Sequence, residues 1–219
     1  MSIKDRALFA KEKNADFLFC LHFNASVHHN LYGAEVWIPA YDDFYVLGRK
    51  FAEIEMQLLS EHGLYSRGIK TKLNDKEEDY YGILRHCSAV GVPSVLIEHC
   101  HMDNDNDKPF YQNGDQQFVE FGKLDATAVA RYLGLSSAEL NVDYSDYPLA
   151  SVEVPKSGEP VRPDKTEPEI CEVEILSLDE KTGELSVRMK ACDADSYIQY
   201  YCYSLDGGET YSELYKWRR

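Results

Sequence analysis

The chain has 219 residues, of which 44% are hydrophobic and 12% aromatic. This length suits one globular domain with a smaller appendage, because a single hydrophobic core usually draws on about 100 to 200 residues. The formal net charge of -15 at pH 7 argues against nucleic acid and anionic membrane surfaces as partners, since both are negatively charged themselves. No apolar run approaches the ~20 residues of a membrane span, and the N-terminal segment lacks the apolar core of a signal peptide.

The first half of the chain alternates between helical and strand patterns. Residues 3–14 have the pattern of an amphipathic helix, and residues 16–22 (DFLFCLH) form a continuous apolar run. Such a run is typical of a strand that is buried on both faces of a parallel sheet. Residues 33–38 predict a second strand, and residues 42–62 predict a helix that ends before a glycine.

Further along, two short runs rich in aromatic or β-branched residues, 80–84 and 92–97, each predict a strand. Residues 116–133 predict a helix that ends at Gly134. Strands that alternate with helices favour an α/β domain, with a mainly parallel sheet flanked by helices, over residues 1–135.

The remainder of the chain has a different composition. Residues 136–169 hold five of the eight prolines among acidic and small residues, and they predict an extended linker. In residues 170–219, three runs of alternating apolar and polar residues are separated by turn sequences, which predicts an antiparallel β-meander. The phrase SLDGGETYS resembles a hairpin of immunoglobulin-like or fibronectin-like modules. Such a sandwich needs ~100 residues, so we expect a partial all-β module.

Two of the predicted strands end in polar side chains that can carry chemistry. His22 and Asn24 lie at the carboxyl end of the first strand, and Glu98 lies at the carboxyl end of the strand over residues 92–97. The carboxyl ends of parallel strands meet at one edge of a sheet, where α/β proteins place their ligand sites. We therefore expect His22 and Glu98 to converge. A hydrogen-bonded core histidine and a strand-end or helix-capping glutamate are the structural alternatives.

Four segments, in order along the chain, carry a family resemblance. ADFLFCLHFNAS is similar to an AD-strand-SIHANA signature, and PSVLIEHCHMDND is similar to a PAVLVExxFxxN segment. RGIKTKLNDKEEDYYGILRH between them, and GKLDATAVARYLGL after them, match the same pattern. The whole resembles the family-3 N-acetylmuramoyl-L-alanine amidases, which are zinc-dependent peptidoglycan hydrolases.

The resemblance implies a set of roles. In that family two histidines and a glutamate hold zinc, which activates a water molecule, and a second glutamate acts as general base and acid. By resemblance, His22 matches the second zinc histidine and Glu98 the catalytic glutamate. Asn24, Arg67 and Arg85 become candidates for contacts with the acidic peptide stem. Peptidoglycan is the implied partner, and the implied location is extracellular or in the cell envelope of a bacterium.

Two of the family's zinc ligands have no counterpart here. Its first histidine lies in a GHGG-like turn and its glutamate ligand follows, whereas no histidine precedes His22. We therefore expect an N-terminally truncated amidase fold that lacks its first strand and has little activity, because a catalytic zinc usually needs three protein ligands. Zinc is expected in the intact parent. Other histidines near the two motifs are conceivable substitute ligands: His28, His29, His99 and His101.

Two other functions stay open. One is a non-catalytic descendant that binds the cell wall or a partner protein without metal. The other, a cysteine hydrolase built on Cys100 and His99, is disfavoured because adjacent side chains on a strand point to opposite faces. We expect Cys20, Cys87 and Cys100 to lie in the core, since all three are in or beside apolar runs.

Overall fold

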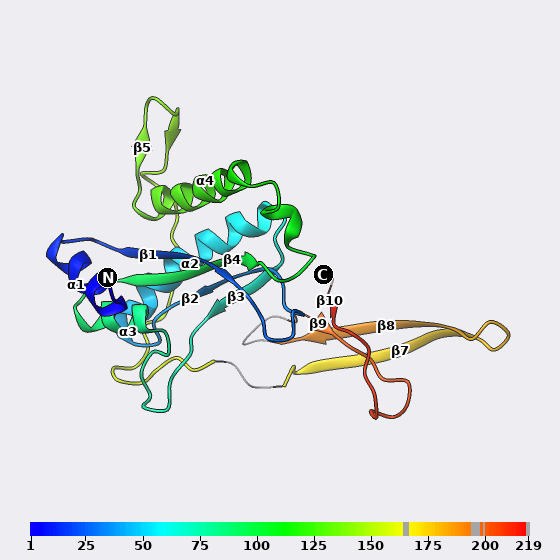
Figure 1. The fold of residues 1–219 in the computed structure, drawn as a ribbon. Coiled ribbons are helices and arrows are strands. Elements are labelled where there is room, and N and C mark those ends of the chain that lie inside the picture. The colour runs from blue at the N-terminus through cyan, green and yellow to red at the C-terminus, as the bar shows by residue number, and fades with distance from the viewer. Residues whose placement is uncertain (164–166, 194–197, 199, 218–219) are drawn as a thin grey trace. The chain divides into compact units, whose positions relative to one another are not determined.

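The computed structural model describes residues 1–163, 167–193, 198 and 200–217. The chain divides into two compact units, Met1–Pro163 and Asp164–Arg219. Figure 1 shows the helices and strands of both units.

The first unit alternates helices and strands, as the sequence pattern predicts. Its elements are α1 (Ile3–Glu12), β1 (Leu18–Asn24), β2 (Ala34–Trp37), α2 (Asp42–Glu61), β3 (Ser66–Lys70), α3 (Gly82–Ala89), β4 (Ser94–His101), the 3-10 turn η1 (Lys108–Phe110), α4 (Asp115–Tyr132), β5 (Ser136–Ser137) and β6 (Val142–Asp143). The main sheet has the strand order β1-β4-β2-β3. β1 and β4 run parallel, as do β2 and β3, whereas β2 and β4 are antiparallel. The predicted α/β fold with a mainly parallel sheet is confirmed.

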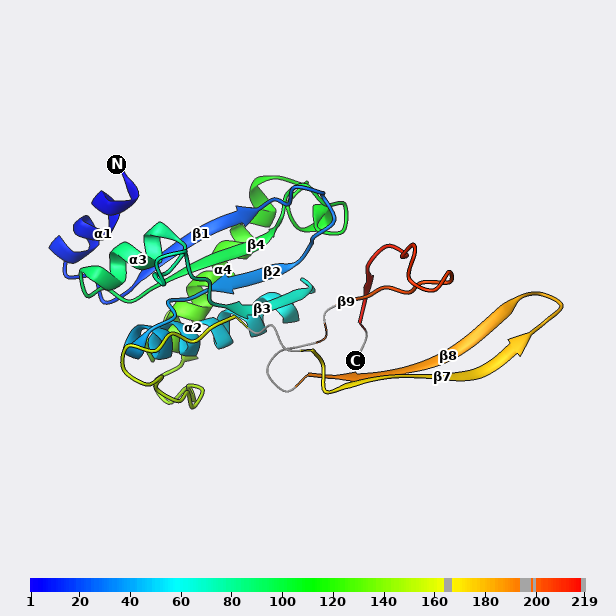
Figure 2. The ribbon, with the colours of Figure 1, turned by 90° about the horizontal axis from the view of Figure 1, so that it is seen from below.

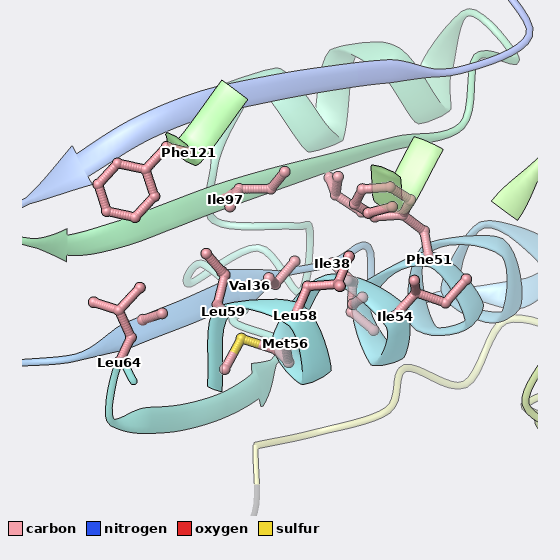
Figure 3. Packing of buried hydrophobic residues seen from close by; sticks show 14 of the residues in the cluster. Val36, Ile38, Phe51, Ile54, Met56, Leu58, Leu59, Leu64, Ile97 and Phe121 are labelled. Carbon is pink, nitrogen blue, oxygen red and sulfur yellow. The ribbon is translucent and has the colours of Figure 1, made fainter. Parts of the chain in front are cut away.

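The two faces of the sheet are covered by different helices. α2 and α4 pack on one face, where Phe51 of α2 is fully buried in the same hydrophobic cluster as Val36, Ile97 and Phe121 (Figure 3). α1 and α3 pack on the other face through Ala7, Ala10, Ile83, Leu84 and Cys87. Figure 2 shows the same layers from below. The sheet thus carries a hydrophobic cluster on each face.

β1 is less buried than its sequence suggests. All eight residues of β4 are buried, whereas Leu21 of β1 is 52% exposed. The predicted burial of this strand on both faces is wrong, because β1 lies at the edge of the sheet with β4 as its hydrogen-bonded neighbour. A strand in this position keeps one backbone edge and part of its side-chain surface open.

The strand predicted over residues 80–84 is also wrong. Tyr80 and Tyr81 lie in a turn, and α3 begins at Gly82. The ring of Tyr81 packs against that of Trp37 with the centroids 5.0 Å apart. Tyr81 therefore packs against the sheet, and neither tyrosine extends it.

Residues 136–163 belong to the first unit by their contacts. β5 and β6 pair antiparallel, and the chain then returns along the unit. The backbone N–H of Val161 donates to Ala40 O at 2.8 Å, and Thr71 Oγ1 donates to Val161 O at 2.7 Å. The division into a catalytic domain of 1–135, a linker of 136–169 and a module of 170–219 remains a prediction.

The described part of the second unit contains two antiparallel strand pairs. β7 (Ile170–Asp179) pairs with β8 (Glu184–Cys192), which confirms the first hairpin of the expected meander. β9 (Tyr200–Tyr201) pairs with β10 (Tyr215–Lys216). The third predicted run, YIQYYCYSL, lies partly outside the described residues. Over the described part of the chain, no helix is long and apolar enough to cross a membrane.

Candidate functional site

The structure places His22 and Glu98 next to each other. β1 and β4 are parallel neighbours, and His22 pairs with Glu98 in their register. The two side chains therefore point to the same face of the sheet, with His22 Nδ1 3.8 Å from Glu98 Oε1. The imidazole is 60% exposed and the carboxyl group 8% exposed, so an accessible base and a nearly buried acid share one sheet edge.

The surroundings of Glu98 favour its protonated form. Burial raises its pKa to about 7, and the negative charge of Glu35 contributes to the rise. Among the described residues, Glu98 Oε2 has no hydrogen-bond partner. A carboxyl group with this pKa exchanges between acid and carboxylate near neutral pH, which is the property that proton transfer in catalysis requires.

Glu35 is the charged partner that the sequence analysis did not single out. It lies opposite Glu98 in the antiparallel register of β2 and β4. Its carboxylate accepts hydrogen bonds from Arg67 Nε at 2.8 Å and Lys70 Nζ at 2.6 Å. Although burial opposes them, Lys70 and Arg67 hold the pKa of Glu35 below its ordinary value. Glu35 therefore stays negatively charged while Glu98 beside it takes up a proton.

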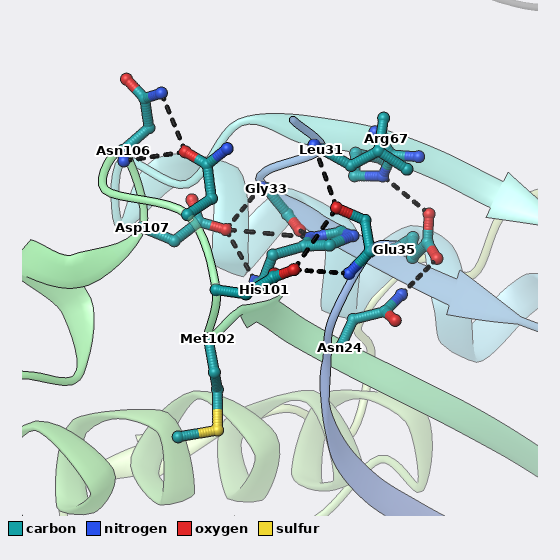
Figure 4. Close-up of polar contacts among 12 residues, drawn as sticks. Asn24, Leu31, Gly33, Glu35, Arg67, His101, Met102, Asn106 and Asp107 are labelled. Carbon is teal, nitrogen blue, oxygen red and sulfur yellow. Dashed lines mark hydrogen bonds and ion pairs between the residues drawn. The ribbon is translucent and has the colours of Figure 1, made fainter. Parts of the chain in front are cut away.

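The three predicted substrate-binding residues differ in their surroundings. Asn24 Nδ2 donates to Glu35 Oε1 at 2.9 Å, and Arg67 is 8% exposed in its ion pair with the same carboxylate (Figure 4). Arg85 Nη1 donates to the backbone oxygens of Asp79 and Tyr80, which holds the turn before α3. The binding roles of Asn24, Arg67 and Arg85 stay predictions.

A hollow of about 450 Å³ opens beside these residues. It is lined by Asn24, Ala25, Ser26, Val27, His28, Asn30, Leu31, Glu35 and His101. Most of this lining comes from the loop between β1 and β2, in which the sequence suggested only His28 and His29 as functional candidates. A volume of this order is within the usual range for small-ligand sites.

A protein-family model now identifies the family. The model described as N-acetylmuramoyl-L-alanine amidase matches residues 1–130, more than half of the 219 residues. The chain belongs to this amidase family. The resemblance inferred from the four sequence segments is confirmed.

Several solved structures are similar to part of this chain. Cwp6 from Clostridium difficile is 22% identical, with a TM-score of 0.55, over 61% of this chain and 20% of that chain. The catalytic domain of the CwlV amidase from Bacillus (Paenibacillus) polymyxa var. colistinus is 18% identical, with a TM-score of 0.49, over 62% and 68%. An amidase from Clostridium difficile 630 is 23% identical, with a TM-score of 0.48, over 63% and 68%. The match thus spans one fifth of Cwp6. No curated protein matches the sequence significantly.

The zinc of the amidase family can be tested against the residues at this edge. His22 offers one imidazole and Glu98 one carboxylate, whereas a catalytic zinc usually has three protein ligands. Within the described part of the chain, three potential ligand atoms gather within 4.8 Å of one another only at Glu55, His99 and Asp125. The side chains at His22 and Glu98 are therefore of types that bind zinc, but there are fewer of them than the three ligands that a catalytic zinc usually has.

The other histidines of the amidase motifs have partners of their own. His29 Nδ1 lies 2.8 Å from Asp103 Oδ2 on the surface, and His28 lines the hollow. His101 is buried, and its Nδ1 donates to Gly33 O at 3.1 Å. His99 contacts the backbone oxygen of His22 on the side of the sheet away from Glu98, so its ring does not add a ligand beside the His22 imidazole.

The cysteine alternative lacks a reactive nucleophile. Cys100 is fully buried, and burial raises the pKa of its thiol to about 12. A protonated thiol is a weak nucleophile. His99 bonds to Asp125 and to His22 O, so it does not serve Cys100 as a base.

Proposed function

We propose that the first unit hydrolyses the amide bond between N-acetylmuramic acid and L-alanine in peptidoglycan. Membership of the amidase family supports this reaction class. The observation that carries the proposal is the pairing of His22 with Glu98, whose pKa burial raises to about 7. A reaction that expels an amine needs a group that first accepts and then donates a proton, and Glu98 has the acidity for both.

In the proposed reaction, Glu98 moves the proton between water and the leaving amine. As a carboxylate it takes a proton from the water whose oxygen attacks the amide carbon. It then gives this proton to the amide nitrogen as the carbon–nitrogen bond breaks. The products are the lactyl carboxylate of the sugar and a stem peptide with a free amino group. Glu35 stays charged, so it keeps the pKa of Glu98 high throughout.

The hollow beside Asn24 is the proposed place for substrate. Glu35 lines the hollow and pairs with Glu98 across β2 and β4. A peptidoglycan strand bound in the hollow would therefore extend toward the sheet edge that carries Glu98 and His22. The exposed imidazole of His22 lies beside Glu98 at this edge of the sheet. We propose that His22 is one ligand of zinc, as in the family. Because the described residues bring no further ligands to it, no reaction step is assigned here to the metal.

A second candidate function is binding of peptidoglycan without hydrolysis. The observation that favours it is the ligand count beside His22, which is too low for a catalytic zinc. In that case the hollow binds a fragment of peptidoglycan, and Glu98 is a buried acid with no catalytic role.

The two functions differ in what they release from purified peptidoglycan. The assay incubates the chain with insoluble peptidoglycan and added zinc chloride, and mass spectrometry detects stem peptides with a free L-alanine amino group. The amidase proposal expects such peptides from the wild type and their loss in Glu98→Gln and His22→Ala. Glu180→Gln, a change to an exposed turn residue of the second unit, is the matched control and should match the wild type.

The same samples also test binding. If the chain sediments with peptidoglycan but releases no peptide, the binding function replaces the amidase proposal. Release that persists unchanged in Glu98→Gln contradicts the assigned role of Glu98.

The proposed substrate, peptidoglycan, also indicates where the protein works. A wall hydrolase works outside the cell or in the cell envelope, so we propose that location in a bacterium. For the second unit we propose a partial immunoglobulin-like or fibronectin-like module, supported by the antiparallel pairs β7–β8 and β9–β10.

A further inference from the structure

A polar cluster lies inside the hydrophobic core, on the side of the sheet away from Glu98. It consists of Glu55 of α2, His99 of β4 and Asp125 of α4, which are 0%, 2% and 8% exposed. The surrounding side chains are apolar: the His99 ring lies 4.9 Å from that of Phe121. One potential ligand atom from each of the three lies within 4.8 Å of the others. Nothing in the proposed hydrolysis uses this cluster.

Glu55 is the member whose carboxyl group lacks compensation. Within the described part of the chain, neither of its oxygens has a hydrogen-bond partner. Burial, together with the interaction with Asp125, raises the pKa of Glu55 to about 9. Burying such a group without a partner costs several kcal/mol, so a proton or a cation has to neutralise it.

His99 is oriented to present one nitrogen to the two carboxyl groups. Its Nδ1 lies 2.9 Å from His22 O, and because a carbonyl oxygen only accepts, Nδ1 carries a hydrogen. Its Nε2 faces Asp125 Oδ1 at 2.8 Å. A histidine that binds a metal through one nitrogen commonly donates the other N–H to a backbone carbonyl, and this bond fixes the ring.

We propose that Glu55, His99 and Asp125 form a binding site for a divalent transition-metal ion of the zinc type. One imidazole nitrogen and two carboxylate oxygens are ligands that zinc accepts, and two negative charges balance the ion. Ligand atoms of a tetrahedral zinc lie about 3.3 Å apart. The present separations extend from 2.8 Å to 4.8 Å at most, so they differ from this spacing by about 1.5 Å or less.

The bound ion has a structural consequence. It joins α2, β4 and α4, which otherwise meet through apolar contacts. Through the bond from His99 Nδ1 to His22 O, it also fixes the end of β1 that carries His22. The site therefore links the hydrophobic core to the end of β1 that carries His22. The proposal of this site does not depend on whether the chain hydrolyses peptidoglycan.

The test uses the purified full chain in the His22→Ala background, which removes the other candidate ligand. After treatment with a chelator, zinc chloride is titrated by calorimetry, and cobalt chloride is used to record visible absorption. We expect one tight equivalent of zinc and a higher melting temperature with zinc. Glu55→Gln and Asp125→Asn, each added to this background, should weaken zinc binding by about tenfold or more, since even outer-shell changes cost that much. Glu180→Gln should leave it unchanged.

Two results overturn the proposal. One is the absence of a tight zinc equivalent, or zinc binding that survives in both ligand variants. The other is a Glu55→Gln chain that is more stable than its parent at alkaline pH, with no effect of zinc on either. The second result would mean that a proton, and not a metal ion, neutralises Glu55. Glutamine has nearly the shape of the protonated glutamate and does not lose a proton at alkaline pH.

Discussion

Glu98→Gln should change the stability of the first unit in a way that depends on pH. Burial raises the pKa of Glu98 from 4.5 to about 7, so the folded chain binds more protons than the unfolded chain between these values. The wild type therefore loses stability as pH rises through this window. The difference corresponds to about 3 kcal/mol at most. Glutamine does not titrate, so the stability of the variant does not fall over this pH range.

The expected observation is a difference curve. The free energy of unfolding of Glu98→Gln minus that of the wild type should be constant below about pH 4.5, rise up to about pH 7, and then level off. An unpaired amide in place of Glu98 Oε2 costs about 1 kcal/mol at every pH, which lowers the curve without changing its rise.

Urea unfolding followed by tryptophan fluorescence measures this curve. Trp37 lies in β2 beside Glu35, and its Nε1 donates to Glu35 Oε1 at 3.1 Å, so it reports on the site. The Trp217→Phe background removes the other tryptophan of the chain. Glu180→Gln in the same background is the control and should give a flat curve. A flat curve for Glu98→Gln would refute the burial of its charge. A curve that falls with pH would mean that Glu98 is paired with a cation.

Other substitutions test the fold, each by urea unfolding. Gly33→Ala should cost more than about 2 kcal/mol, because φ is +99° and a Cβ would lie 2.1 Å from Tyr65 O, whereas Gly122→Ala, with open space in α4, should stabilise by about 0.5–1 kcal/mol. Equal effects of the two would contradict this. Phe51→Ala should cost about 3–5 kcal/mol, since the side chain is fully buried, and a cost below 1 kcal/mol would refute that packing. Arg67→Met should cost about 3 kcal/mol by leaving Glu35 with fewer cations, and no loss would mean that the pair is exposed.

The strands that carry His22 and Glu98 could be predicted because their signal is local. Each is an unbroken apolar run followed by polar residues, and this pattern needs no knowledge of neighbours. β4 lies where a strand was predicted, and all of its residues are buried. β1 is less buried than predicted, because its place at the sheet edge depends on strand order, which a run of apolar residues does not encode.

β3 and α3 could not be predicted because their sequences carry no clear local signal. β3 has the sequence SRGIK, and its buried Arg67 donates a hydrogen bond to Glu35 of β2. α3 has eight residues, too few for a clear helical period. Both elements depend on partners far away in the sequence.

The buried cluster had a signal that could have been noticed. Glu55 follows Phe51 by four residues and precedes Leu59 by four, so it lies on the apolar face of α2. A charged residue at such a position predicts a buried polar group. Its partners His99 and Asp125 could not be inferred, because they come from other elements and only the tertiary fold brings them together.

The edge position of β1 also affects how the protein behaves in concentrated solution. At its outer side, the strand has no hydrogen-bonded neighbour among the described residues. Its sequence LFCLHFN holds no lysine or proline, the residues that commonly prevent strands from pairing between molecules. The strand is thus an open template for an extended segment of another chain. Light scattering against concentration, with Leu21→Lys as the protected variant, would follow this tendency during purification.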